Sequence, residues 1–118
     1  MIKKILIITC LLGYSSLSLG TNLSTSQNLP EMCKELSSEV INLSNHQSDD
    51  TCQGTLGRTG VMINLAGTFL ENNNPQGAKN NLAMADRYFG EAISFNCEYK
   101  EKILTLQQRE KTIATQIS

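Results

Sequence analysis

The fold is decided by the stretch from Cys52 to Cys97, CQGTLGRTGVMINLAGTFLENNNPQGAKNNLAMADRYFGEAISFNC. Two arms of similar length flank the turn sequence NNNP at 72–75, and the midpoint between the two cysteines lies inside that turn. If both arms are helices packed antiparallel, Cys52 and Cys97 meet at the end opposite the turn. The stretch therefore predicts a helical hairpin closed by a Cys52–Cys97 disulfide. The chain-entropy argument gives such a disulfide roughly 4 kcal/mol of stabilisation.

The first arm has a face of small residues and a face of apolar ones. Its small face contains Gly57, Gly60, Asn64 and Gly67 at 3–4–3 spacing, which lets another backbone approach closely. No strand pattern precedes these glycines and no Gly-Lys-Ser/Thr sequence follows them, so they do not indicate a phosphate-binding loop. The apolar side of this arm is expected to be Met62, Leu65, Ala66, Phe69 and Leu70. The buried side of the second arm is expected to be Ala78, Leu82, Ala85, Tyr88, Phe89, Ala92, Ile93 and Phe95.

A further helix is predicted upstream, from about 30 to 45. Its apolar residues recur at helical spacing: Met32, Cys33, Leu36, Val40 and Leu43. Asn28 is a candidate cap, and Pro30 suits a first helical turn. The polar run at 45–50 ends this helix, and Asp50 or Thr51 is expected to cap the next one.

Downstream of Cys97, an apolar stripe continues at 4–3–4–3–4 spacing with one acidic interruption: Tyr99, Ile103, Leu106, Glu110, Ile113 and Ile117. An unbroken helix over 77–116 would be roughly 60 Å long, about twice the width of a globule of this size. We therefore favour a break near Asn96-Cys97 and a fourth helix that folds back. The alternative is a projecting tail that binds a partner or a second copy of the chain. The expected fold is all-α, a three- or four-helix bundle built on the disulfide-closed hairpin.

The N-terminus has the pattern of a secretory signal peptide over residues 1–20. Lys3 and Lys4 precede the short apolar run at 5–12, and Ser18-Leu19-Gly20 gives a small-x-small cleavage pattern before Thr21. Residues 21–29 are polar and are expected to form a flexible arm before a single helical domain at 30–118. The sequence therefore predicts export to the periplasm or the medium. Without Lys3 and Lys4, eight Lys and Arg remain against eleven Asp and Glu, a net charge of −3 that does not indicate nucleic-acid binding.

The chemistry-bearing residues do not form a catalytic or metal-binding pattern. Cleavage removes Cys10 and leaves Cys33 as the odd cysteine, which is expected to be a buried thiol, with pairing to Cys52 or to another chain as the alternative. There is no Cys-x-x-Cys pair, and the only histidine, His46, lies in a polar loop, so no metal or cofactor is expected. No titratable pair has a local signature of acid–base catalysis, and we expect no enzymatic activity.

Two resemblances to known families rest on the hairpin. Met62, Leu65, Ala66 and Phe69, followed by Ala78, Leu82 and Ala85, resemble one tetratricopeptide helix pair, although Gly90 replaces the closing proline and no second copy follows. Across residues 30–97, the order of Cys33, Cys52-Gln53-Gly54, Phe69-Leu70, Pro75 and Phe95-Asn96-Cys97 resembles small periplasmic immunity proteins against type VI secretion amidases. The chain lacks a further central cysteine and the tyrosine after the Cys-x-Gly motif. That resemblance implies a disulfide-bonded helical protein that plugs the active site of a toxin.

The sequence thus favours a non-catalytic exported protein that binds another protein, such as an immunity or inhibitor protein. A small-ligand carrier or a structural subunit of an envelope assembly is the alternative. The contact surface is expected at the hairpin tip or along the 99–117 seam, where a homodimer would also form. The candidate partner-binding residues are Asn72, Asn73, Asn74, Gln76, Tyr99, Ile103 and Leu106.

Overall fold

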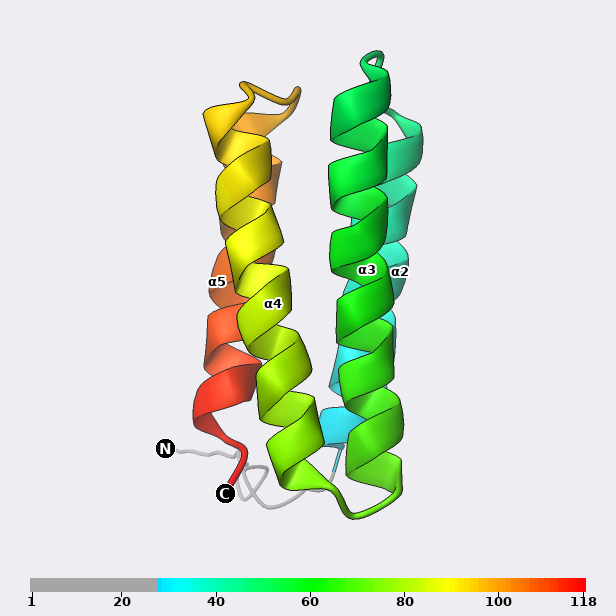
Figure 1. Cartoon of the computed structure of the whole chain (residues 1–118), viewed down its shortest axis with the longest axis vertical. Coiled ribbons are helices and arrows are strands. Elements are labelled where there is room, and N and C mark those ends of the chain that lie inside the picture. Colours follow the sequence, from blue (N-terminus) through cyan, green and yellow to red (C-terminus); the bar gives the residue numbers. More distant parts are fainter. Residues whose placement is uncertain (1–27) are drawn as a thin grey trace, which may run out of the picture.

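Four antiparallel helices make up residues 28–118, the part of the chain that the computed structural model describes. They are α2 (Leu29–Asn45), α3 (Asp50–Glu71), α4 (Pro75–Ser94) and α5 (Lys100–Thr115). Figure 1 shows α3 and α4 side by side, with α2 behind α3 and α5 behind α4. The α2–α3 and α4–α5 loops lie at one end of the bundle, and the α3–α4 turn lies at the other. The expected signal peptide at 1–20, and the arm as far as residue 27, lie outside the described residues.

The fold class is therefore all-α, and the predicted break after the second arm is confirmed. The α4 helix ends at Ser94, and α5 runs back along the bundle from Lys100. Two non-glycine residues of the connecting segment, Asn96 and Tyr99, adopt left-handed backbone conformations with φ of 57° and 65°. These conformations let the chain reverse within five residues, so the seam packs inside the bundle instead of projecting.

The disulfide joins Cys52 at the start of α3 to Cys97 in the α4–α5 loop, with the two Cα atoms 5.6 Å apart. The predicted pairing is confirmed, and the third cysteine of the described chain, Cys33, is a free and fully buried thiol. The disulfide is consistent with an oxidising compartment. Within residues 28–118, no helix is both long enough and apolar enough to span a bilayer.

The small face of α3 packs against α2. A Cβ atom added at Gly67 would lie 3.1 Å from both the Cβ of Cys33 and the carbonyl oxygen of Pro30. At Gly60 it would lie 2.5 Å from a side-chain carbon of Ile41, and the Gly60 carbonyl accepts a 2.7 Å hydrogen bond from buried Ser37. The expectation that these glycines allow a close backbone approach is confirmed.

Two residues of the expected core are exposed, and the close approach of α2 and α3 explains the first of them. The side of α3 that faces α2 carries the glycines, so Leu65 lies outside the core with 40% of its surface exposed. Phe95, expected to be buried, is the residue just after α4 and is 50% exposed. The fully buried large side chains of the bundle are Phe89, Leu36, Leu56, Ile63, Leu82, Ile103, Leu106 and Val40.

The cap of α3 differs from expectation by one residue, whereas the cap position of α2 is the expected one. Asp49, not Asp50 or Thr51, caps α3, and its carboxylate accepts a 3.0 Å hydrogen bond from the Cys52 amide. Asn28 occupies the cap position of α2, but its side chain makes no capping hydrogen bond. The side chain of Asn74 caps α4 by accepting from the Gly77 amide at 3.0 Å. The capping carboxylate or amide satisfies an amide that the first helical turn leaves without a partner.

Candidate binding surface at the disulfide-bonded end

The residues that the sequence nominated for partner binding do not form one site. Asn72, Asn73, Asn74 and Gln76 are exposed at the α3–α4 turn, and Tyr99 is exposed at the opposite end of the bundle. Ile103 and Leu106 are fully buried on the inner face of α5. A partner therefore has no access to these two side chains while α5 is packed against the bundle.

At the hairpin tip (residues 72–76), two polar side chains are used locally. Asn74 caps α4, and the amide of Gln76 donates a 3.0 Å hydrogen bond to Asn80. Asn73 has a left-handed backbone with φ of 57°, which asparagine tolerates better than most residues. The tip thus has a clear structural explanation in turn formation and capping.

The disulfide-bonded end (residues 46–49 and 95–99 with Cys52) is held mainly by contacts between residues that are far apart in the sequence. The side chain of Gln47 is buried, donates to the Glu98 carbonyl at 3.0 Å and accepts from the Glu98 amide at 2.8 Å. The Glu98 carboxylate in turn accepts from the Ser48 amide at 2.8 Å, and Gln53 donates to the Gln47 carbonyl at 2.8 Å. Together with the disulfide, these bonds fix the α2–α3 loop against the α4–α5 loop.

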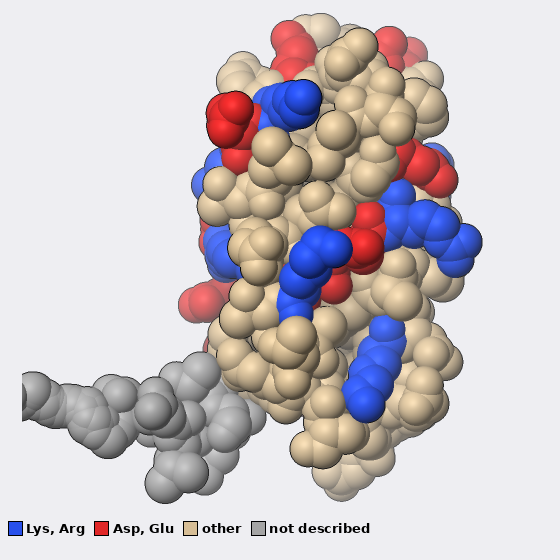
Figure 2. Space-filling model, turned by 90° about the vertical axis from the view of Figure 1, so that its left-hand side faces the viewer, with Lys and Arg blue, Asp and Glu red and all other residues tan. Residues whose placement is uncertain are grey.

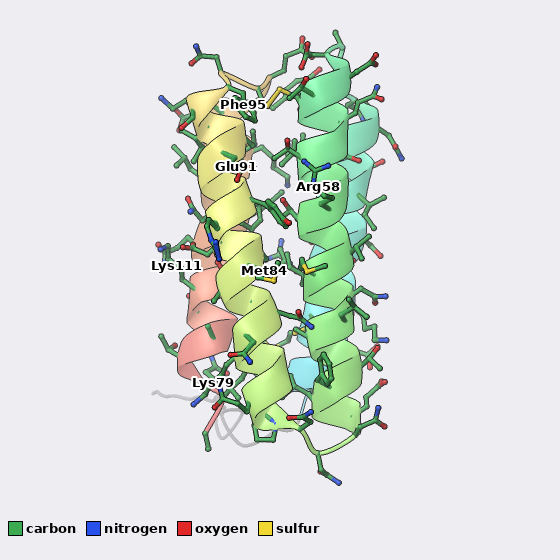
Figure 3. The ribbon with its side chains drawn as sticks, viewed as in Figure 1. Arg58, Lys79, Met84, Glu91, Phe95 and Lys111 are labelled. Carbon is green, nitrogen blue, oxygen red and sulfur yellow. A yellow bond between two sulfur atoms is a disulfide. The ribbon has the colours of Figure 1, made fainter. Side chains whose placement is uncertain are left out.

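Two aromatic side chains are exposed on this fixed end. Phe95 is 50% exposed and Tyr99 is 56% exposed, the two highest fractions among the large hydrophobic residues of the described chain. Figure 3 shows Phe95 at the end of α4, beside the disulfide. The left-handed backbone of Tyr99 costs of order 1 kcal/mol for a residue of this kind. An aromatic held out of the core by a strained backbone is a candidate binding residue.

Tyr99 also borders a groove between α2 and the start of α5, with a volume of about 440 Å³. Its other lining residues are Glu39, Asn42, Leu43, His46 and Lys102. A second groove of about 390 Å³ lies further along the same two helices, between residues that include Met32 and Ile113. Hydrogen bonds from Arg109, together with the nearby positive charges of Arg109 and Lys102, lower the pKa of the Glu39 carboxyl.

The titratable side chains in the core are held in their neutral forms. Burial raises the pKa of the Cys33 thiol to about 11, so it remains a thiol at neutral pH and is a poor nucleophile. Burial also raises the pKa of Glu110 to about 8. No group of three or more metal-ligating side chains is found among residues 28–118. The Nδ1 atom of His46 lies 2.8 Å from the carbonyl oxygen of Asn42 in the preceding helix.

Charged side chains do not gather into one patch on the α4–α5 side of the molecule. Figure 2 shows lysine and arginine side chains interspersed with acidic ones on this face. Electrostatic steering of a nucleic acid would need a continuous basic surface, which this face does not provide.

Sequence reasoning missed most of this surface. It placed Phe95 in the core and gave Gln47 and Glu98 no role, because nothing in the local pattern signals a contact between residues 51 positions apart. The one available signal was the turn-forming run at 45–50 opposite Asn96-Cys97, which the disulfide brings together.

The geometry defines a class of protein by fold: a disulfide-bonded antiparallel four-helix bundle with exposed aromatic residues at its fixed end. Comparison with known proteins adds no relative, because no family model, no curated protein and no solved structure matches the chain.

Proposed function

We propose that this is an exported, non-catalytic protein that binds and inhibits another protein, in the manner of an immunity protein against a secreted toxin. The contact surface is the disulfide-bonded end, with Phe95 and Tyr99 as its central residues. The signal-peptide pattern at 1–20 supports export, and the Cys52–Cys97 disulfide supports an oxidising destination.

The observation that carries the proposal is the exposure of two aromatic side chains on a segment that cannot easily move. Aromatic residues dominate the binding energy of protein interfaces. A surface already held in its binding conformation loses less conformational entropy on association. Here the disulfide and the Gln47–Glu98 hydrogen bonds supply that rigidity. The narrow end of a helical bundle also has the shape to enter a cleft in a partner.

The first experiment is affinity capture from the secreted and envelope fractions of the source, with the oxidised chain from residue 21 as bait. A captured protein is then titrated calorimetrically against variants. Phe95→Ala and Tyr99→Ala should each weaken binding by about 30-fold or more, the effect of a typical interface hot spot. The matched control is Val61→Ala, since Val61 is 49% exposed on α3, away from this end.

The same titration separates the two surfaces expected from the sequence. A loss of affinity in Asn72→Ala and Gln76→Ala, with none in Phe95→Ala or Tyr99→Ala, would move the contact surface to the hairpin tip. If a correctly folded oxidised bait captures no protein, the inhibitor function is overturned.

A small-ligand carrier is the second candidate, because the groove beside Tyr99 falls within the volume range of ligand pockets. Its test is the fluorescence of an environment-sensitive apolar probe. Enhancement that Leu43→Asp abolishes and Leu104→Asp leaves intact would favour this function, since Leu43 lines the groove and Leu104 is an exposed residue of α5 outside its lining. Probe fluorescence that does not change on adding the protein would remove this candidate.

A further inference from the structure

Glu110 is the acidic interruption in the apolar seam of α5, and it is buried. Only 2% of its surface is exposed, and its neighbours along the seam, Leu106 and Ile113, belong to the core. Its Oε1 atom has no hydrogen-bond partner among the described residues. A buried carboxyl group is costly in its charged form, so this residue needs an explanation beyond packing.

The partner of Glu110 is another carboxyl group, that of Asp86 on α4. A hydrogen bond between the two side chains lowers the pKa of Asp86 and raises that of Glu110. Because two ionised carboxylates have no proton to share, this bond requires that one of them is protonated. The Asp86 carboxylate also accepts from Gln107 at 3.1 Å and forms an ion pair with Lys111 at 3.2 Å. Figure 3 shows Lys111 beside α4.

These contacts decide which carboxyl group holds the proton. Burial acts to raise the pKa of Asp86, but hydrogen bonds from Lys111, Glu110 and Gln107 hold it below its ordinary value. For Glu110, burial, the hydrogen bond to Asp86 and the charge of Asp86 all raise the pKa, and only Lys111 opposes them. Glu110 therefore carries the proton and donates a hydrogen bond to the Asp86 carboxylate.

Among residues 28–118, Lys111 is the one cation that acts on the pKa of Glu110. On α5 itself, Arg109 and Lys102 pair with Glu39 of α2 at 2.8 Å and 3.6 Å. The remaining charged residues of α2 and α4, the two helices packed against α5, are Glu31, Lys34, Glu35, Lys79, Arg87 and Glu91. Lys34 pairs with Glu71, Glu91 is half-buried, and the other four are exposed.

We propose that the Asp86–Glu110 pair is a proton-dependent latch that holds α5 against α4, and that loss of its proton releases α5 from the bundle. Release is confined to α5 because the Cys52–Cys97 disulfide lies before α5 in the chain and so continues to hold α3 and α4 together. The α3–α4 hairpin stays closed, while Ile103, Leu106 and Ile113 become accessible. The apolar seam of α5 is then exposed only at pH values at which the Asp86–Glu110 pair has lost its proton.

The direction of the pH dependence follows from the raised pKa. With the packed-state pKa of Glu110 at about 8 and an ordinary value of 4.5 after release, the stabilisation is complete below pH 4.5 and is lost as the pH rises through 8. Between these values, the equilibrium constant for release of α5 should rise by up to tenfold per pH unit.

Hydrogen exchange of the full oxidised chain tests the latch. After correction for intrinsic exchange rates, protection of the amides at 103–113 should fall up to tenfold per pH unit towards pH 8, while that of the amides at 59–66 in α3 stays constant. Glu110→Gln keeps a donor to Asp86 but cannot ionise, so its α5 protection should not change with pH. Protection of α5 that is independent of pH in the unmodified chain, or an equal fall in Glu110→Gln, would overturn the proposal.

A second measurement uses only the unmodified chain, so it does not depend on whether a variant folds. The side-chain carboxyl carbon of Glu110, followed by nuclear magnetic resonance, should titrate with a midpoint near 8. A midpoint near 4.5 would show that the packed helix tolerates the ionised form, and the latch would be excluded.

Discussion

The α2–α3 pair and the α4–α5 pair have the same antiparallel arrangement but are held together by different chemistry. In the first pair, Gly60 and Gly67 bring the backbones of two helices together, and the contact depends on shape. In the second pair, the buried Glu110 carboxyl meets the partly exposed Asp86 carboxylate, which also pairs with Lys111, and we expect this contact to depend on protonation. One bundle thus contains an interface that should be insensitive to pH and another that should respond to it.

The two pairs are joined at one end by the Cys52–Cys97 disulfide, and its removal should have the largest effect. Cys52→Ser combined with Cys97→Ser should lower the free energy of unfolding by about 4 kcal/mol, because the unfolded chain regains the entropy of an open loop. Urea denaturation of the oxidised protein and the double variant measures this. Cys33→Ala distinguishes loss of the crosslink from loss of a thiol, since Cys33 makes no disulfide. Equal midpoints for the double variant and the parent would contradict the prediction.

The pH profile of stability sharpens the contrast between the pairs. Glu110 adds stability that is lost as the pH rises from 4.5 through 8, by at most about 1.4 kcal/mol per pH unit. Asp86 and Glu39 have lowered pKa values, so their contribution is lost as the pH falls below the ordinary values of 3.8 and 4.5. Maximum stability is therefore expected near pH 4.5. Denaturation at a series of pH values should give this optimum, and Glu110→Gln should flatten only its alkaline side.

A side chain at the α2–α3 contact should break the pair that depends on shape. Gly67→Val should lower the free energy of unfolding by about 1–3 kcal/mol at any pH, because Cys33 and the Pro30 carbonyl leave no room for it. Gly90→Val is the matched control on α4, where an added Cβ meets no atom within 4 Å. We expect that control to remain within about 0.5 kcal/mol of the parent, because valine favours a helix slightly more than glycine. Similar losses in both variants would contradict the prediction, because the close contact exists only at Gly67 and helix propensity favours valine at both positions.

The smallest effect is expected from the hydrogen bonds that join the two loops. Gln47→Ala should lower the free energy of unfolding by about 1–2 kcal/mol, because the Glu98 backbone loses two partners. Gln53→Ala removes one hydrogen bond from an exposed side chain and should cost less. If the two variants lose equal stability, the buried amide is not what couples the loops.

The successes and errors of sequence analysis follow the range of the interactions involved. Helix positions, the hairpin and the disulfide pairing could be predicted because helical periodicity and the central turn are local patterns. The inner face of α5 was also correctly predicted from its spacing, including the position of Glu110 on it. The exposure of Phe95 and Leu65 could not be predicted, since periodicity identifies an apolar side chain but does not show which neighbour covers it.

The sequence by itself determined the first helix, the antiparallel hairpin and the covalent link between Cys52 and Cys97, and it favoured, over a projecting tail, a fourth helix that folds back. Only the tertiary structure decided that Glu110 meets Asp86, that Gln47 meets Glu98, and that Phe95 and Tyr99 remain exposed. The reason is physical: each of these features depends on how helices rotate and approach one another. That geometry is set by the close packing of small residues such as Gly60 and Gly67 against specific partners, which no single segment encodes.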